Sequence, residues 1–252
     1  MLYEIKKIIT HDSYHKTLFF SCNECRNAKP GQFVMVWLPG IDEIPMSLSH
    51  IGEMQAITLK KVGEATGALY KMEEGDKIGI RGPYGHGFIE KGKKALFVAG
   101  GIGIAPLLPF IKKYKGEKHV ILAARNKNLI LFKEELENME LYIATDDGSL
   151  GFKGLATDLM EKLVKEHEFD IVYACGPEKM MKKVFDICKE NKIDMQASLE
   201  RYMKCGVGIC DSCTINGYRV CKEGPVFDFV TLSKMPDFGK WKRNEAGKKI
   251  PI

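Results

Sequence analysis

The sequence predicts an antiparallel β barrel, followed by a doubly wound parallel α/β sheet and a small C-terminal module. Three observations predict this fold: short strands between Gly and Pro residues in the first part, a repeated strand-then-helix pattern in the second, and a cluster of four cysteines near the end. A chain of 252 residues suits two domains and a small third module. The expected domains are residues 1–90, 91–195 and 196–252.

Composition and charge exclude several classes of protein. The chain is 45% hydrophobic and 28% charged, with 38 Lys and Arg against 33 Asp and Glu, which is typical of a soluble globular protein. The Lys residues are interspersed with Glu, so neither nucleic acid nor a membrane surface is the expected partner. The longest apolar stretch, residues 95–110, is interrupted by glycines and Pro106, and the first residues lack a signal-peptide pattern. We therefore expect a cytoplasmic protein.

The two larger domains differ in their pattern of apolar residues. In the first, apolar and β-branched runs predict strands over 33–38, 55–62 and 77–80. The second contains four strand-and-helix pairs, which imply a parallel sheet. Their strands are expected at 95–100, 119–124, 140–145 and 170–175, and their helices at 104–114, 131–139, 154–164 and 178–190. A further strand is expected at 193–199, and the Lys-rich residues 239–252 are expected to form an exposed tail.

A glycine-rich turn containing Gly101 and Gly103 follows the first strand of the α/β domain. Such a turn lets backbone N–H groups approach a pyrophosphate at the positive end of the next helix, so it predicts a nucleotide site. A turn of this kind also occurs for steric reasons alone, and both interpretations stay open on this motif. Arg125, after the next strand, would tolerate a 2′-phosphate, so NAD and NADP are both possible.

The fourth strand of this domain ends in Cys175 and Gly176, at the sheet edge where ligands bind in open α/β folds. A thiol there could border a nicotinamide ring without competing for hydride. The alternative is a buried structural cysteine. No His lies near Cys175 in the sequence, so we do not expect it to act as a nucleophile.

The barrel domain contains two further candidate segments, residues 45–49 (PMSLS) and 63–69 (GEATGAL). The second offers a hydroxyl and free amides at a helix start, which suits a diphosphate. The alternative is ordinary turn chemistry with Thr66 as the N-cap residue.

The cysteine cluster is the strongest signal, with candidate metal ligands Cys205, Cys210, Cys213 and Cys221. The CxxxxCxxC spacing matches the loop of plant-type [2Fe–2S] centres. A two-residue hairpin at Asn216-Gly217 would return Cys221 to the other three ligands. We expect the N–H groups freed by Gly206 and Gly208 to point at the sulfides, and Ile209 to shield the centre from water. Structural zinc is the alternative, although paired CxxC knuckles are absent.

The remaining cysteines and histidines show no ligand pattern. Cys22 and Cys25 form an isolated CxxC and are expected to be surface or strand residues. None of the six His residues is assigned a role.

The motifs occur in an order that resembles the ferredoxin reductase superfamily and, within it, the electron-transfer subunits of NAD-linked dihydroorotate dehydrogenase, up to about Val230. The motifs are PMSLS at 45–49, GEAT at 63–66, GPYGHGF at 82–88, GGIGIAP at 100–106, TDDGSLGFKG at 145–154, ACGP at 174–177, SLERYMKCGVGICDSC at 198–213 and VCKEGPVF at 220–227.

The resemblance implies FAD bound to the barrel. The implied contacts are Pro45, Met46, Ser47 and Leu48 along the isoalloxazine, Leu59 and Lys60 beside it, and Gly63, Ala65 and Thr66 at the diphosphate. The family usually has Arg where this chain has Ile44, so a cationic partner for the flavin is missing unless Lys60, Lys61 or Arg81 supplies it.

The resemblance also implies a function in electron transfer. A flavin can exchange hydride with NAD and single electrons with an iron–sulfur cluster, so electrons would pass from a partner's FMN through the cluster and FAD to NAD. The implied partner is an FMN-containing dihydroorotate dehydrogenase catalytic subunit in a heterotetramer of two plus two. Cations beside the cluster are expected to raise its potential; they are Arg201, Lys204, Arg219 and Lys222.

Two alternatives stay open at this point. The same fold serves as the flavin subunit of a hydrogenase, a sulfide dehydrogenase or a ferredoxin:NAD(P) oxidoreductase. A different class of protein, a zinc-bound interaction module, would be colourless, whereas a flavin and a cluster absorb visible light.

Overall fold

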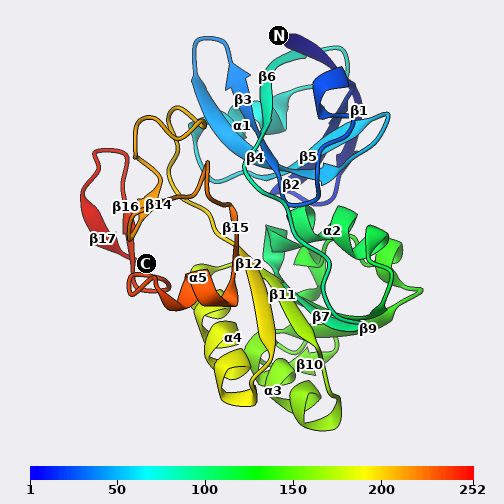
Figure 1. The fold of residues 1–252 in the computed structure, drawn as a ribbon. Helices are drawn as coiled ribbons and strands as arrows, with labels where there is room; N and C mark the ends of the chain where they lie inside the picture. Colours follow the sequence, from blue (N-terminus) through cyan, green and yellow to red (C-terminus); the bar gives the residue numbers. More distant parts are fainter.

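The computed structural model describes residues 1–252 and places a barrel above a twisted sheet, with a C-terminal segment running along both (Figure 1). The barrel is closed, with strand order β1-β2-β5-β4-β3-β6. Its strands are β1 (Leu2–Thr10), β2 (His15–Phe20), β3 (Phe33–Leu38), β4 (Asp42–His50), β5 (Gln55–Lys60) and β6 (Lys77–Tyr84), joined in part by the short turn η1 (Asn23–Cys25) and helix α1 (Glu64–Lys71). All its neighbouring strands are antiparallel, as predicted.

The sequence predicts only half of the barrel strands. The strand expected at 33–38 has those bounds, while β5 ends earlier and β6 extends further than expected. Strands β1, β2 and β4 were missed. In β1 most side chains are at least partly exposed, so apolar alternation is weak, and β4 contains Pro45, which is a poor strand signal.

The second domain has a seven-stranded sheet in the order β10-β9-β8-β7-β11-β12-β15. Its strands are β7 (Lys94–Gly100), β8 (Glu117–Ala124), β9 (Glu140–Thr145), β10 (Phe152–Lys153), β11 (Ile171–Cys175), β12 (Asp194–Ser198) and β15 (Val226–Asp228). All are parallel to their neighbours except β15, which pairs antiparallel with β12. The strand expected at 193–199 is therefore confirmed as β12. The division at residue 195 stays a prediction, since β12 crosses that position.

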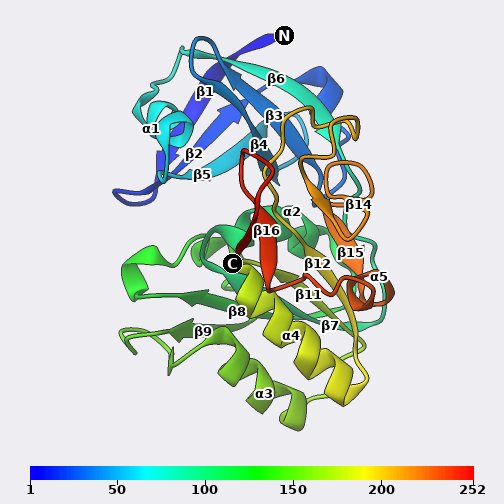
Figure 2. The same ribbon diagram turned by 90° about the vertical axis from the view of Figure 1, so that its left-hand side faces the viewer.

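Helices cover both faces of this sheet, which confirms the doubly wound arrangement (Figure 2). The helical elements are η2 (Gly101–Gly103), α2 (Ile104–Lys113), η3 (Lys127–Leu129), η4 (Glu134–Leu136), α3 (Ala156–Glu166) and α4 (Glu178–Asn191). Alternate residues of β7 face opposite cores: Phe97 packs in the core with α2, whereas Val98 packs in the core with α3 and α4.

The helix expected at 131–139 is wrong, because only the short turn η4 forms there. Phe132 has a φ of 59°, which is incompatible with a right-handed helix. Its side chain is buried instead, in edge contact with His11 of the barrel. Phe132 therefore packs between the domains, whereas Leu131 and Leu136 pack in the core with α2.

After β12 the chain has no regular structure over 199–213 and then forms short elements. These are β13 (Thr214–Ile215), β14 (Tyr218–Arg219), α5 (Phe229–Ser233), β16 (Trp241–Arg243) and β17 (Lys249–Pro251). The expected tail at 239–252 is mostly exposed, as predicted, but it is not irregular: residues 241–251 pair as a hairpin through a turn in which Gly247 has a φ of 79°. No helix is long and apolar enough to cross a membrane.

Candidate electron-transfer site

The glycine-rich turn and the Cys175-Gly176 turn lie against each other at the carboxyl ends of the adjacent parallel strands β7 and β11. A Cβ atom on Gly103 would lie 2.3 Å from the carbonyl oxygen of Cys175, and one on Gly176 would lie 2.9 Å from the backbone of Gly100. Gly101 has a φ of 55° and open space beside it. The two motifs therefore form one backbone-lined edge with room for a ligand.

This edge faces the barrel. Helix α2, which begins directly after the glycine-rich turn, contacts β4, and η2 contacts β5. These are the strands that carry the candidate flavin residues. The fold thus places the predicted nucleotide turn beside the predicted flavin strands, an arrangement that hydride transfer between two stacked rings requires.

The candidate flavin residues differ in exposure. Pro45, Met46, Ser47, Lys60 and Thr66 are half-buried, and Gly63 is exposed; Leu48, Leu59 and Ala65 are buried. Leu48, Leu59 and Ala65 all pack in the barrel core. The flavin assignments stay predictions.

Helix α1 begins at the GEAT motif, and Thr66 takes part in its N-terminal cap without being the N-cap residue, so the turn-chemistry alternative is correct in part and stays open. Gly63 is the N-cap residue, and the Thr66 hydroxyl reaches back to accept the N–H groups of Val62 (3.0 Å) and Gly63 (2.9 Å). This leaves the first-turn N–H groups of α1 without intrahelical partners. They suit a diphosphate at this end of the helix.

Backbone N–H groups converge on the cysteine sulfurs of the C-terminal segment. The Sγ of Cys205 accepts from the N–H of Val207 and Ile209, both at 3.4 Å, and the Sγ of Cys221 accepts from that of Gly208 at 3.1 Å. The N–H of Cys221 in turn donates to the Sγ of Cys213 at 3.4 Å. Gly206 and Gly208 have φ values of 72° and 78°, so the predicted role of glycine in aiming these donors is consistent with the backbone.

These contacts shift the acidity of the thiols in opposite directions. Burial opposes ionisation of Cys205, but the N–H groups of Cys210, Ile209 and Val207 outweigh it and lower its pKa to about 6. Burial, together with its neighbour Cys213, raises the pKa of Cys221 to about 12. Hydrogen-bond donors around cysteine sulfur favour the thiolate that a metal centre requires.

The hairpin expected at Asn216-Gly217 forms, with Thr214 opposite Arg219 and φ values of 46° and 89° at the turn. It places Cys221 beside Cys213, both almost fully buried. The side chains of the four candidate ligands are not arranged to hold a single metal ion in this structure. Their donor set and the surrounding N–H groups fit a thiolate-bound metal centre.

One expectation for this segment is wrong. Ile209 does not shield the thiols, because its side chain is 80% exposed. Its backbone N–H is committed to Cys205, which directs the side chain outward.

Two of the cations expected to tune the cluster are paired with carboxylates. Arg201 is buried against Glu178 of α4, with Nη2 2.8 Å from Oε1, and Arg219 pairs with Glu223 at 2.6 Å. Their charges are therefore largely offset, whereas Lys204 and Lys222 remain exposed. The prediction that these cations raise the potential stays untested.

The sequence offers Arg81 as a substitute cation for the flavin, and the structure gives it other contacts as well. Its guanidinium forms a two-bond ion pair with Glu43 of β4 and donates to the carbonyl oxygen of Cys205. Lys61, another candidate cation for the flavin, lies over the ring of Tyr70, with its Nζ 5.5 Å from the ring centroid.

Cys175 has the properties expected of an uncharged thiol beside a nicotinamide ring. Burial raises the pKa of its thiol to about 12, so the group stays protonated at neutral pH.

Cys22 and Cys25 are buried rather than surface residues, and their sulfurs lie 3.0 Å apart in the barrel.

Histidines that the sequence left without a role connect the two domains. The Nε2 of His50, at the end of β4, lies 3.5 Å from Oε2 of Glu135, and Phe132 packs against both His50 and His11. Contact with His50, together with Lys112, lowers the pKa of Glu135 to about 2. No sequence signal could reveal this contact, since the residues lie far apart in the chain.

Comparison with known proteins agrees with this geometry. Residues 200–233 match the family model described as the iron-sulfur cluster binding domain of dihydroorotate dehydrogenase B, and residues 97–186 match the oxidoreductase NAD-binding domain. A Methanocaldococcus jannaschii relative named "Probable dihydroorotate dehydrogenase B (NAD(+)), electron transfer subunit" is 46% identical, over 98% of this chain and 96% of the relative. A Pyrococcus furiosus relative with the same name is 45% identical over 92% of each chain.

The chain belongs to the family of dihydroorotate dehydrogenase B electron-transfer subunits. It is thus an NAD-linked oxidoreductase subunit, and the predicted iron–sulfur module and NAD-binding sheet are confirmed as family features.

Solved structures show the same architecture. A chain from the structure of an NADH-dependent reduced ferredoxin-NADP oxidoreductase superposes with a TM-score of 0.84, at 32% identity over 91% of this chain and 89% of its own. A ferredoxin NADP+ reductase from Neisseria gonorrhoeae, solved with bound FAD and NADP, gives a TM-score of 0.61 at 17% identity, covering 75% of this chain and 90% of its own. That second likeness shows the fold alone.

Proposed function

We propose that this chain carries electrons between the FMN of a dihydroorotate dehydrogenase catalytic subunit and NAD, in a complex of two copies of each subunit. The observation that supports it most is the seating of the Cys205–Cys221 segment against the barrel, with N–H groups aimed at its sulfurs. When bound, FAD exchanges hydride with NAD and single electrons with a [2Fe–2S] cluster. The chain would hold these carriers at fixed positions and tune their surroundings. We propose that it is cytoplasmic.

The residues have distinct proposed roles. Cys205, Cys210, Cys213 and Cys221 would hold the cluster, and the flavin residues predicted from the sequence would hold FAD. Gly101 and Gly103 would receive the pyrophosphate of NAD on the turn that begins α2. Cys175 would border the nicotinamide as a neutral thiol, which neither takes a hydride nor donates a charge to the ring.

Dihydroorotate would be oxidised on the partner. The chain contains a six-stranded barrel and an open sheet, and neither is the eight-fold βα barrel in which such FMN chemistry is expected. Apolar side chains are exposed beside the cluster ligands: Tyr202 and Val207 are 40% and 39% exposed, and Ile209 is 80% exposed. Their position supports docking of the partner next to the cluster.

A second candidate is a ferredoxin-linked NAD(P) oxidoreductase subunit, favoured by the 32% identical chain from such an enzyme. The two candidates differ in the partner and not in the cofactors. Copurification of the chain from its own cells decides between them, because an FMN subunit of roughly 300 residues would be recovered only with the first candidate.

Anaerobic purification with assay of iron, acid-labile sulfide and flavin tests the carrier assignment. We expect two irons and two sulfides with one FAD per chain, from the composition of a [2Fe–2S] centre. Replacing Cys210 or Cys213 with Ser should remove the iron, whereas the matched control Cys188→Ser, buried in α4, should keep it. Zinc without sulfide or flavin would refute the proposal.

A further inference from the structure

Arg81 links the barrel to the segment that carries the candidate cluster ligands. It lies on β6, and its Nη2 donates to the carbonyl oxygen of Cys205 at 3.2 Å. This hydrogen bond joins a barrel side chain directly to the backbone of a candidate cluster ligand. The two residues are 124 positions apart in the sequence.

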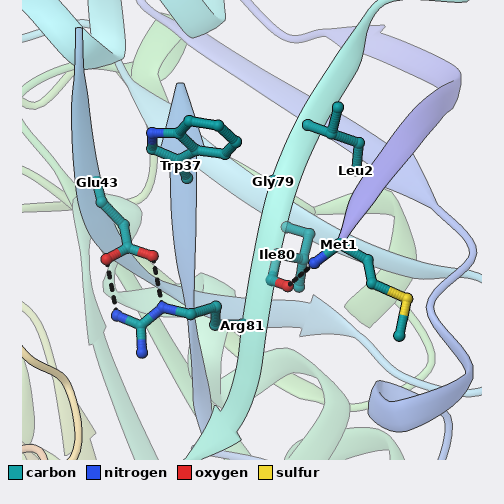
Figure 3. Close-up of a pocket in the computed structure, with 7 residues that line it drawn as sticks. All are labelled: Met1, Leu2, Trp37, Glu43, Gly79, Ile80 and Arg81. Atoms are coloured by element: carbon teal, nitrogen blue, oxygen red, sulfur yellow. Dashed lines mark hydrogen bonds and ion pairs between the residues drawn. The ribbon is translucent and has the colours of Figure 1, made fainter. Parts of the chain in front are cut away.

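The guanidinium is held in place from two sides. Glu43 accepts from Nε and Nη2, both at 2.7 Å, and Figure 3 shows the two carboxylate oxygens facing the two nitrogens. Tyr84 accepts from Nη1 at 3.3 Å. The paired carboxylate raises the pKa of Arg81, which is charged at any physiological pH. Because Glu43 and Tyr84 fix the planar guanidinium, its Nη2–H group points at the Cys205 carbonyl oxygen in a defined direction.

Apolar packing seats the ligand segment at the same place. A Cβ on Gly206, the residue after Cys205, would lie 2.8 Å from Cγ of Met35 on β3. Met35 is fully buried and shares one apolar core with Cys213 and Cys221. No layer of side chains separates the segment from the barrel at this point.

The pair also borders a surface pocket, which is lined by Met1, Leu2, Trp37, Glu43, Gly79, Ile80 and Arg81 (Figure 3). None of the predicted flavin residues lines this pocket. Glu43, Tyr84 and the Cys205 carbonyl oxygen engage the guanidinium of Arg81, so its contacts direct it to the cluster segment.

We propose that Arg81 is a positioning residue that, supported by Glu43, fixes the Cys205 segment against the barrel and so sets the rate of electron exchange between FAD and the cluster. This rests on the proposed function. The step would move one electron between the two carriers, with no bond formed and no proton taken by Arg81. Its rate depends on the separation and relative orientation of the carriers, which the Arg81 contact restrains.

The test uses the full chain loaded with FAD and cluster, as wild type and as Arg81→Gln, Arg81→Lys and Glu43→Gln. Arg26→Gln is the matched control, since Arg26 is a barrel arginine paired with Glu53 without contact to the cluster segment. Three readouts are needed: iron and flavin content, the cluster potential by redox titration with electron paramagnetic resonance, and rapid-mixing traces that separate flavin reduction by NADH from cluster reduction.

We expect Arg81→Gln to slow the cluster-reduction phase several-fold and to lower the cluster potential, because a cation beside a ligand is lost. Arg81→Lys should keep the potential closer to that of the wild type but remain slow, because an ammonium group cannot form the fork with Glu43. Glu43→Gln should slow the same phase while leaving the arginine charge. Reduction of the flavin by NADH should be unchanged throughout, and Arg26→Gln should match the wild type.

Wild-type rates and potential in loaded Arg81→Gln would overturn the inference. If that variant fails to bind iron, Glu43→Gln decides, and an unchanged cluster-reduction phase there overturns it as well. A wild-type protein that binds neither iron nor FAD would instead refute the proposed function.

Discussion

Gly103 lies directly against the backbone of Cys175, and a Cβ atom at position 103 would come within 2.3 Å of the Cys175 carbonyl oxygen. Gly103 belongs to the turn after β7, and Cys175 ends the neighbouring strand β11. This contact joins the two motifs from which the sequence predicts nucleotide binding. Only a residue without a side chain allows the two turns to approach so closely.

Replacing Gly103 with Ala should therefore weaken NADH binding and destabilise the fold by about 1–3 kcal/mol, the usual cost of overpacking. Isothermal calorimetry with NADH and chemical denaturation measure the two effects. Gly67→Ala is the matched control, because a Cβ at that helical position meets no atom within 4 Å. Equal NADH affinity in the two variants would contradict the assignment of the turn.

Ile209 exposes 80% of its side chain immediately before the candidate ligand Cys210. Replacing it with Asp should weaken binding of the catalytic subunit without loss of iron, because a charge would be buried at the proposed interface. Analytical ultracentrifugation of the mixed subunits measures the association. Ile89→Asp provides the control, since Ile89 is 64% exposed outside the cluster segment. The docking assignment fails if both variants assemble like the wild type.

Arg201 and Glu178 form a buried ion pair, with 2% and 9% of their side chains exposed. It ties the segment before the cluster to the start of α4. Arg201→Met should lower the free energy of unfolding by about 3–5 kcal/mol, because it leaves the buried Glu178 carboxylate without a charged partner and with only the N–H of Gly239. Chemical denaturation measures the loss. The double variant with Glu178→Leu should recover part of it, and a double variant less stable than Arg201→Met would argue against a charge effect.

Glu135 should make the stability of the domain interface depend on pH. His50, with Lys112, lowers its pKa from 4.5 to about 2, so its contribution is complete above the unfolded-state pKa and is lost as the pH falls through the folded value. Glu135→Gln should therefore lower the thermal midpoint at pH 6, and the difference from the wild type should disappear toward pH 2. Glu134→Gln, which removes no ion pair, should leave the thermal midpoint unchanged. If Glu135→Gln and the wild type differ in thermal midpoint by the same amount at every pH, the stability does not depend on ionisation of Glu135.

The sequence by itself determined the elements and motifs whose signals are local. The strand-and-helix repeat predicted β7, α2, β9, α3, β11 and α4, the Asn216-Gly217 dipeptide predicted the hairpin, and the spacing of Cys205, Cys210 and Cys213 predicted a cluster-binding loop. Each signal consists of neighbouring residues whose periodicity or backbone preference acts over one or two turns.

Only the tertiary structure decided which distant residues meet. The false helix at 131–139 has a helical period because Leu131 and Leu136 pack in the core with α2, whereas Phe132 leaves the helical region and contacts His11 of the barrel. The contacts of Arg81 with Cys205, Arg201 with Glu178, and His50 with Glu135 likewise join different elements. Their physical cause is the way the barrel, sheet and C-terminal segment bury their shared faces, which local sequence patterns do not encode.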